Sequence, residues 1–110
     1  MAKHLLLVFA NPVEGQEDEF NAFYDGTHLK DMLSAPGVVA AQRFRVTQLD
    51  PPQVVRHHYL TVYELETDDP GTTMLELYDA NARGDIQPFD ALDPDARSLV
   101  FDAIGERQTS

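Results

Sequence analysis

One histidine lies in a setting where it could move a proton. His28 follows the residues Asp25-Gly-Thr, and Asp25 and Asp31 each stand three positions away from it. A carboxylate that binds one imidazole nitrogen leaves the other nitrogen free to act as a base near neutral pH. The alternative interpretation is a capping or surface histidine in a kinked helix. We predict that His28 is catalytic and that Asp31 contributes to substrate binding.

Two more side chains could stabilise negative charge on a substrate. Arg43 stands among apolar neighbours, where a guanidinium can hold a carboxylate, phenolate or enolate through paired hydrogen bonds. Tyr63 could donate a hydrogen bond to a developing oxyanion. The alternatives are a salt bridge from Arg43 to Glu64 or Asp102, a dimer contact for Arg43, and interface packing for Tyr63. We predict catalytic roles for Arg43 and Tyr63.

Aromatic residues are the candidate walls of a pocket. Phe20, Phe23 and Tyr24 are spaced i, i+3 and i+4, which places them on one stripe of a helix. Tyr59 and Tyr63 are four residues apart in a predicted strand. Because alternate residues of a strand point to the same face, the two tyrosines share one face. The alternative for the helical stripe is ordinary core packing. We predict that Phe20, Tyr24 and Tyr59 contact the substrate.

The sequence lacks the motifs of several other kinds of site. It has no cysteine, which excludes thiol nucleophiles, thiolate metal sites and disulfides. His57 and His58 are adjacent and would point to opposite faces of a strand, so they are poorly placed to share a metal ion. There is no Gly-x-Ser-x-Gly turn and no glycine-rich phosphate loop, and none of the histidines is singled out as a haem ligand. We expect neither a metal nor a cofactor.

The composition limits the partners. With 19 acidic and 8 basic side chains the formal charge is −11, and such a surface repels phosphate backbones and anionic lipid heads. The first apolar run, from Leu5 to Ala10, is too short for a signal-peptide core or a membrane span. We expect a cytoplasmic protein that binds neither nucleic acid nor membrane. The 110 residues are enough for one domain, residues 1–110.

Hydrophobic patterning predicts four strands and two helices. In chain order these are a strand over 4–10, a helix over 14–34, strands over 38–47 and 57–65, a helix over 70–83 and a strand over 98–106. Residues 85–97 are expected to be irregular and to dock Ile86, Phe89 and Leu92. In the second strand Val38 is predicted to lie on the face opposite Arg43. The buried stripe of the second helix is predicted to consist of Met74, Leu77 and Tyr78.

The first helix is predicted to be broken in the middle. Its second half has an apolar stripe of its own, formed by Leu29, Met32 and Leu33. That stripe lies nearly opposite Phe20 on an ideal helix, and the change of phase falls at 25–27. Gly26 can close one helix and Thr27 can cap the next, which would place His28 at the corner.

The order of elements, βαββαβ, predicts an α+β fold of the ferredoxin-like kind. In this fold a four-stranded antiparallel sheet carries two helices on one face. The four strands have too many apolar residues for a single covered face, and a large apolar surface left in water is unfavourable. We therefore predict a homodimer, a dimeric α/β barrel, in which a second copy covers the other face.

Two segments resemble a known family. Residues Phe23-Tyr-Asp-Gly-Thr-His-Leu-Lys-Asp-Met-Leu33, followed by Pro36-Gly-Val-Val-Ala-Ala-Gln-Arg-Phe44, resemble the EthD-type branch of the dimeric α/β-barrel superfamily. The shared features are an aromatic-led helix, a histidine, a Pro-Gly turn and an arginine-bearing strand. The resemblance implies a cleft between helices and sheet that takes small, apolar, often aromatic molecules. The superfamily includes cofactor-free monooxygenases, isomerases, polyketide cyclases, haem peroxidases and members without known activity, so the fold does not select a reaction.

The start of the chain adds a second resemblance. Residues Lys3-His-Leu-Leu-Leu-Val-Phe9 are similar to polyketide cyclases of the same superfamily, which implies that His4 lines the pocket and binds substrate. The combined hypothesis is a cofactor-independent enzyme that performs acid–base chemistry, of the isomerase, cyclase or lyase type, on a small apolar or aromatic carbonyl compound. The alternatives are a non-catalytic dimer that binds a small hydrophobic ligand, and a cofactor-free monooxygenase of the same superfamily.

Overall fold

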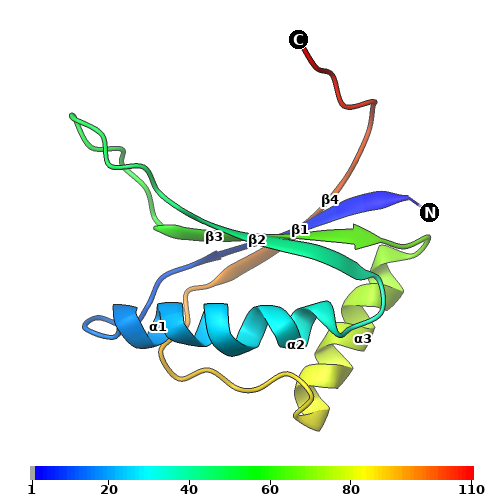
Figure 1. Cartoon of the computed structure of the whole chain (residues 1–110), viewed down its shortest axis with the longest axis horizontal. Helices are drawn as coiled ribbons and strands as arrows, with labels where there is room; N and C mark the ends of the chain where they lie inside the picture. The colour runs from blue at the N-terminus through cyan, green and yellow to red at the C-terminus, as the bar shows by residue number, and fades with distance from the viewer. Residues whose placement is uncertain (1) are drawn as a thin grey trace.

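The computed structural model describes residues 2–110 and contains a four-stranded sheet with helices on one of its faces (Figure 1). The strands are β1 (Lys3–Ala10), β2 (Val38–Arg45), β3 (Tyr59–Glu66) and β4 (Arg97–Asp102). The helical elements are α1 (Glu17–Phe23), a π-helical turn (Tyr24–His28), α2 (Leu29–Leu33) and α3 (Pro70–Arg83). Neighbouring strands are antiparallel in the order β2-β3-β1-β4. The predicted α+β ferredoxin-like fold is confirmed, with the apolar β1 in the interior of the sheet.

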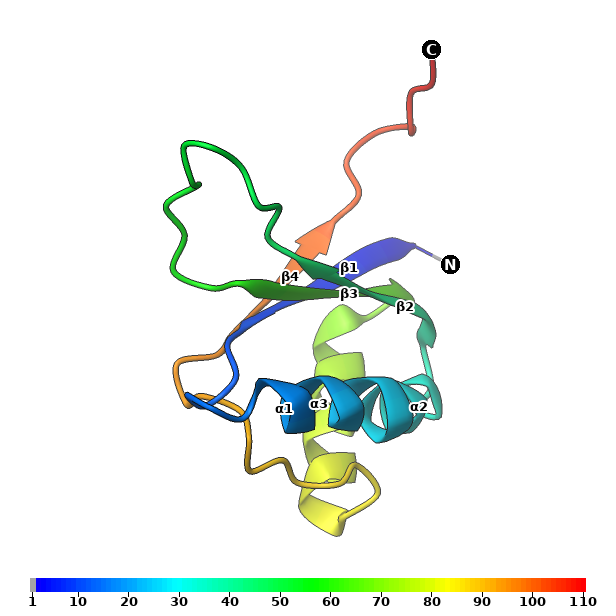
Figure 2. The ribbon, with the colours of Figure 1, turned by 60° about the vertical axis from the view of Figure 1, so that its left-hand side comes forward.

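The two faces of the sheet differ in what covers them. The helices pack on one face of the sheet (Figure 2). On this face the strands contribute buried side chains at His4, Leu6, Ala10, Tyr59, Thr61, Tyr63 and Leu65. The opposite face, called the open face below, is formed by the alternate residues. Four of its apolar side chains, Leu5, Phe44, Leu99 and Phe101, are between 39% and 50% exposed. Tyr59 and Tyr63 thus lie under the helices, and interface packing on the open face is the wrong interpretation for them.

The first helix differs from the prediction at its centre. Gly26 does not close one helix and Thr27 does not cap another, because residues 24–28 form a π-helical turn that runs on without interruption into α2. A π-turn holds an extra residue, so it rotates the residues that follow it about the helix axis. This rotation brings the two opposed apolar stripes to the same side, and Phe20, Tyr24 and Met32 are all buried.

α3 begins and ends where the sequence predicts. The carboxylate of Asp69 accepts a hydrogen bond from the backbone N–H of Thr72, Pro70 is the first helical residue, and Gly84 ends the helix with a φ of 83°. The predicted irregular segment is confirmed over 85–96, with Arg97 already in β4, and Ile86 is buried.

The buried side of α3 agrees with the prediction at Leu77, which is buried, and at Met74, which packs against the core. It differs at Tyr78, which is 61% exposed, and it also includes the buried Thr73 and Ala80. The Thr73 hydroxyl is hydrogen-bonded to the Thr67 hydroxyl at 2.9 Å, and its side chain stands beside Gly37. These contacts turn the small residues of α3 toward the sheet, so the prediction for Tyr78 was wrong.

Three of the four strands, β2, β3 and β4, are shorter than predicted, and β2 is irregular. The chain leaves the sheet after Arg45, returns at Tyr59 and leaves it again after Asp102. A shift of register between Val38 and Ala40 puts Val38 on the helix-covered face together with Arg43. The predicted strict alternation failed here because a bulge adds one residue to the strand.

Two glycines with left-handed backbone offer a matched test of how α2 is joined to the sheet. A Cβ at Gly37 (φ +87°) would lie 3.3 Å from Cγ2 of Thr73, whereas a Cβ at Gly84 (φ +83°) would meet nothing within 4 Å. Alanine in this conformation costs roughly 1–2 kcal/mol at either position. Because only Gly37 also faces crowding, we expect Gly37→Ala to lower the free energy of unfolding by about 1 kcal/mol more than Gly84→Ala, measured by urea denaturation. An equal loss of free energy of unfolding in the two variants would mean that the Thr73 side chain moves aside without an energetic penalty.

Candidate active site

Three buried side-chain polar atoms in residues 2–110 have no hydrogen-bond partner. They are Nε2 of His4, Nδ1 of His28 and the hydroxyl of Tyr63. His4 and Tyr63 come from neighbouring strands on the helix-covered face, and His28 comes from the π-turn. A buried polar group without a partner costs about 1–3 kcal/mol, and such groups call for a functional explanation. These atoms therefore mark the layer between sheet and helices as the candidate site.

His4 is the best oriented of the three. Its Nδ1 lies 2.8 Å from Oδ1 of Asp102, which stands directly opposite it on β4. The side chain of His4 is only 10% exposed. A carboxylate that accepts the Nδ1 proton leaves Nε2 as the basic nitrogen. The sequence placed His4 in the pocket only by resemblance and considered Asp102 as a partner of Arg43, so this pair was not anticipated.

His28 is half-buried between aromatic rings. It stacks on Phe23 at 5.8 Å between ring centroids and meets the edge of Tyr24 at 5.0 Å. Burial lowers the pKa of His28 below its ordinary value, and the Asp31 carboxylate opposes this shift in part. The two carboxylates expected to orient the ring are bonded elsewhere, Asp25 to Arg43 and Asp31 to the backbone N–H of Gln87. The structure therefore supports a neutral imidazole at His28 that no carboxylate holds.

The buried tyrosines are hydrogen-bond donors at neutral pH. Burial raises the pKa of Tyr63 far above its usual value, and neighbouring Tyr24 adds to this while Arg43 opposes it. Burial likewise raises the pKa of Tyr24, against the effects of Arg43 and of a hydrogen bond with Thr61. Tyr63 pairs with Leu6, two residues along β1 from His4 and on the same face. Its hydroxyl is thus a neutral donor on the sheet surface that also carries His4.

The guanidinium of Arg43 makes hydrogen bonds and ring contacts with other residues of the chain. It donates hydrogen bonds to Asp25 at 2.9 Å and to the Asn21 side chain at 2.7 Å, and only 15% of its side chain is exposed. Its guanidinium carbon lies 4.8 Å from the centre of the Tyr24 ring and 5.6 Å from those of Phe20 and Tyr59. These contacts are of the cation–π kind. The alternative salt bridge weighed for Arg43 exists, but with Asp25, because Arg43 faces the helices whereas Glu64 faces the open side.

The aromatic residues predicted to contact substrate form a packed cluster, as the alternative of core packing also predicts. Phe20 is buried and contacts Tyr59 at 4.9 Å and Tyr24 at 5.0 Å between centroids. Phe89, from the irregular segment 85–96, stacks on Phe23 at 4.2 Å. The Tyr59 hydroxyl donates a hydrogen bond to the Glu17 carboxylate. The sequence prediction missed Phe89 as part of this cluster, because it depends on where an irregular segment docks.

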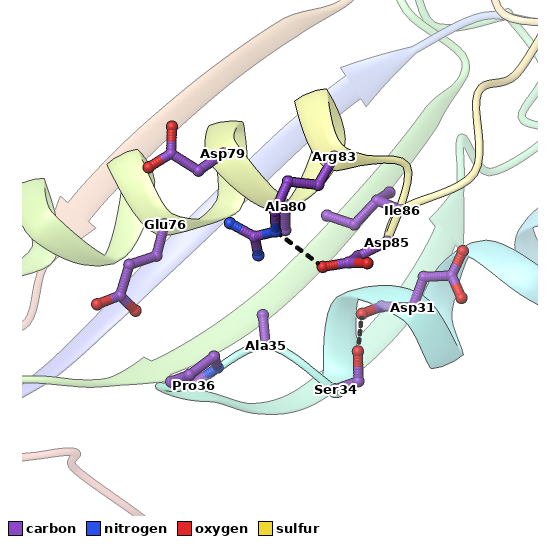
Figure 3. A pocket seen from close by; sticks show the side chains of 10 residues that line it. All are labelled: Asp31, Ser34, Ala35, Pro36, Glu76, Asp79, Ala80, Arg83, Asp85 and Ile86. Carbon is purple, nitrogen blue, oxygen red and sulfur yellow. Dashed lines mark hydrogen bonds and ion pairs between the residues drawn. The ribbon is translucent and has the colours of Figure 1, made fainter.

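The last predicted site residue, Asp31, borders a different cavity. This cavity of about 280 Å³ lies between α2 and α3, and its charged lining residues are Asp31, Glu76, Asp79, Asp85 and Arg83 (Figure 3). Arg83 pairs with Asp85 at 3.1 Å. Residues 2–110 contain no group of three or more histidines and carboxylates arranged to hold a metal ion. None of their helices is long and apolar enough to cross a membrane.

Comparison with solved structures defines the class of the fold. An EthD family protein from Bacillus halodurans C-125 is 14% identical, with 98% of this chain and 100% of that chain covered and a TM-score of 0.60. HapK from Hahella chejuensis is 17% identical, with 100% and 99% covered and a TM-score of 0.62. The heme-degrader MhuD from Mycobacterium tuberculosis, solved with two hemes bound in its active site, is 15% identical, with 96% and 99% covered and a TM-score of 0.63. No family model and no curated protein matches the chain.

The chain therefore has the fold of the EthD-like, dimeric α/β-barrel proteins, which confirms at the level of fold the resemblance found in the sequence. Identities this low describe a shared architecture. They do not select a reaction, because one fold carries many functions.

Arg43 provides a test of what holds the aromatic wall together. A lysine keeps the charge but cannot reproduce the planar, forked contacts with Asp25, Asn21 and the rings. We expect Arg43→Lys to lower the free energy of unfolding by about 1–3 kcal/mol, measured by urea denaturation. Arg45→Lys, an exposed neighbour on the same strand, should change it little. If both variants behave alike, the contacts of Arg43 contribute no more than a surface charge.

We expect the lowered pKa of His28 to make the free energy of unfolding depend on pH. Because burial lowers its pKa in the folded chain, the unfolded chain takes up the proton first as the pH falls through about 6.5. We expect the wild type to lose free energy of unfolding between about pH 7 and about pH 5, and His28→Gln to lose less over the same range. Urea denaturation at both pH values measures the difference. Parallel losses in the two proteins would show that His28 does not titrate abnormally.

Proposed function

We propose that this chain is a cofactor-independent enzyme that performs acid–base chemistry on a small apolar or aromatic carbonyl compound. The observation that carries the proposal is the group of three buried, unpartnered polar atoms on His4, His28 and Tyr63. Two are imidazole nitrogens and one is a neutral hydroxyl, which are the groups that remove a proton and stabilise the resulting enolate. The aromatic cluster beside them suits an apolar or aromatic substrate.

The geometry favours different chemical roles for the site residues on the strands and for the histidine in the π-turn. Nε2 of His4, with Asp102 bound to Nδ1, would remove the proton on the carbon next to the carbonyl, and the electrons of that C–H bond would form the enolate. The Tyr63 hydroxyl would donate a hydrogen bond to the enolate oxygen. The imidazolium of His4 would then return the proton to another carbon. In the other outcome the enolate carbon would attack a second carbonyl, and the oxygen of that carbonyl would take the proton from His4 as its π bond breaks. These outcomes correspond to an isomerase and to a cyclase.

His28 and Arg43 receive narrower roles in this proposal. The neutral ring of His28, held among aromatic side chains, would accept a proton from a substrate hydroxyl or return one on the side of the helices. Arg43 would act as a positioning residue, because its donors already hold Asp25 and Asn21 and its plane holds the aromatic rings. Phe20, Tyr24 and Tyr59 would form the wall of the substrate site.

A non-catalytic role is the second candidate, and one observation favours it. The best-defined cavities border neither His28 nor Tyr63. A dimer that binds a small hydrophobic ligand needs the aromatic cluster but not a correctly placed base. A cofactor-free monooxygenase of the same fold would use the same cluster with an electron-rich substrate.

Haem fits poorly beside His28. A haem needs a flat slot beside its axial ligand. The rings of Phe20, Phe23, Tyr24 and Phe89 fill the space beside His28 by packing on one another at 4.2 to 5.6 Å between centroids. His57 already uses its Nε2 to bind the backbone carbonyl of Asp95.

The proposal includes a homodimer. The open face presents apolar side chains from every strand, among them Leu5, Phe44, Leu99 and Phe101. Contiguous apolar surface of this kind marks an interaction site. A second copy would cover it with an identical surface, and homodimers with two-fold symmetry are the commonest oligomers.

Turnover of a substrate panel tests the proposed chemistry. The panel contains phenolic, lactone and polyketone compounds, and the variants are His4→Gln, His28→Gln, His28→Ala and Tyr63→Phe. For a substrate that the wild type converts, we expect each loss to lower kcat/KM by about 100- to 10,000-fold. His58→Gln, an exposed histidine outside the site, is the matched control. Equal turnover by the wild type and all site variants, with their folds retained, would remove the mechanism.

A further inference from the structure

Part of the candidate site lies in space that side chains already fill. His28 and Tyr63 border none of the best-defined cavities of residues 2–110, and the space beside His28 is occupied by aromatic rings. Protein interiors are close-packed, so a small molecule needs room that the aromatic cluster itself must provide. One of the rings therefore has to move, and which ring can move depends on how each one is attached to the fold.

Phe89 differs from the other rings of the aromatic cluster in its attachment. Phe20 and Phe23 belong to α1, Tyr24 to the π-turn and Tyr59 to β3, so the hydrogen bonds of a helix or of the sheet hold the backbone that carries them. Phe89 belongs to the irregular segment 85–96, which runs from the end of α3 past α1 to β4 (Figures 1 and 2). Its side chain is half-buried, whereas Phe20 and Tyr24 are buried.

The irregular segment is anchored on both sides of Phe89. On one side, the backbone N–H of Gln87 donates a hydrogen bond to Oδ2 of Asp31 at 3.0 Å. On the other side, the backbone carbonyl of Ala91 accepts a hydrogen bond from the backbone N–H of Val13 at 2.7 Å. The two anchors fix the position of the segment against α2 and against the turn that follows β1.

Between these anchors the backbone is not held. No backbone hydrogen bond joins residues 88–90 to the rest of residues 2–110, and Pro88 has no N–H to donate. Pro88 and Asp90, on either side of the ring, are both exposed. Few backbone hydrogen bonds and few buried contacts are the physical features of a segment that opens locally. Phe89 can therefore leave the cluster while both anchors stay in place.

The place that the Phe89 ring occupies has the form of a slot for a planar ring. The ring lies parallel to that of Phe23, at an angle of 8° and 4.2 Å between centroids. It meets Tyr24 edge to face, at 84° and 5.6 Å. Stacked and edge-to-face contacts are the arrangements that aromatic rings prefer. Phe23 and Tyr24 also contact His28, at 5.8 and 5.0 Å, so a ring in the slot shares both neighbours with the imidazole.

We propose that Phe89 is a displaceable cover of the substrate site, and that a planar aromatic ring of the substrate takes its place against Phe23 and Tyr24. This inference rests on the proposed function and narrows its substrate class to compounds that contain an aromatic ring. Displacement of Phe89 breaks one stacked and one edge-to-face contact, and only another aromatic ring can form both of them again. An aliphatic compound of the same size cannot, so it leaves the cover in place.

A single tryptophan can report the position of the cover, because the chain has none of its own. The probe is phenol, and cyclohexanol is the aliphatic compound of similar size. We expect phenol to shift the emission of Phe89→Trp to longer wavelength in a saturable way, because the indole moves into water, and cyclohexanol to leave it unchanged. Phe23→Trp, in the same cluster but on α1, is the matched control and should keep its emission wavelength with either compound.

Two results with these variants would overturn the cover. One is an emission wavelength of Phe89→Trp that phenol does not change. The other is an equal shift of Phe89→Trp and Phe23→Trp, which would mean that phenol loosens the whole cluster.

NMR spectroscopy of the wild type provides a second measurement without a substitution in the cluster. In the free protein we expect nuclear Overhauser effects between the stacked rings of Phe89 and Phe23. Saturation with phenol should remove these effects and produce new ones between phenol and Phe23. Effects between Phe89 and Phe23 that persist at saturating phenol, or the absence of any effect from phenol, would contradict the inference.

Turnover of the substrate panel separates the failure of this inference from the failure of the proposed function. If phenol displaces Phe89 but the wild type converts no compound of the panel, the cover is supported and the proposed catalysis is overturned. If the wild type converts only compounds without an aromatic ring and phenol leaves Phe89 in place, the catalysis is supported and the cover is overturned.

Discussion

A sheet that is apolar on both faces is the constraint on which this structure depends. Four strands provide enough apolar side chains for two buried faces, but one chain of this length supplies helices for only one of them. The covered face can therefore be specialised: it holds His4, Tyr63 and the rings around Arg43 out of water. The open face stays uncovered in the single chain and would be buried by the proposed second copy, and the loop 46–58 and the C-terminal segment extend on that side alone.

On the covered face, hydrogen bonds and contacts with aromatic rings hold the residues of the candidate site in place. Asp102 binds His4, and Arg43 binds both the π-turn, through Asp25, and the aromatic rings, through their faces. Burial keeps Tyr24 and Tyr63 protonated by raising their pKa, and it keeps His28 neutral by lowering its pKa. The site thus combines the neutral hydroxyls of Tyr24 and Tyr63 and the neutral imidazole of His28 with the ion pair of Arg43 and Asp25. This combination suits proton transfer with a small neutral molecule.

The sequence predicted those features that depend on neighbours along the chain. The limits of α3 follow from Asp69, Pro70 and Gly84, and the apolar run of β1 predicts an interior strand. Features that depend on distant contacts escaped prediction. The His4–Asp102 bond joins residues 98 positions apart and depends on the register of β1 with β4, which no local pattern determines. The π-turn was visible as a change of phase, but its form depends on both stripes being buried against the same sheet.

Burial of the open face in solution is the central requirement of a sheet that is apolar on both faces. Sedimentation velocity of the wild type, over a dilution series that begins at micromolar concentration, measures this without any variant. We expect a species with the mass of two chains that persists into the lower part of the series. A species with the mass of one chain throughout, with the fold intact by circular dichroism, would contradict the account.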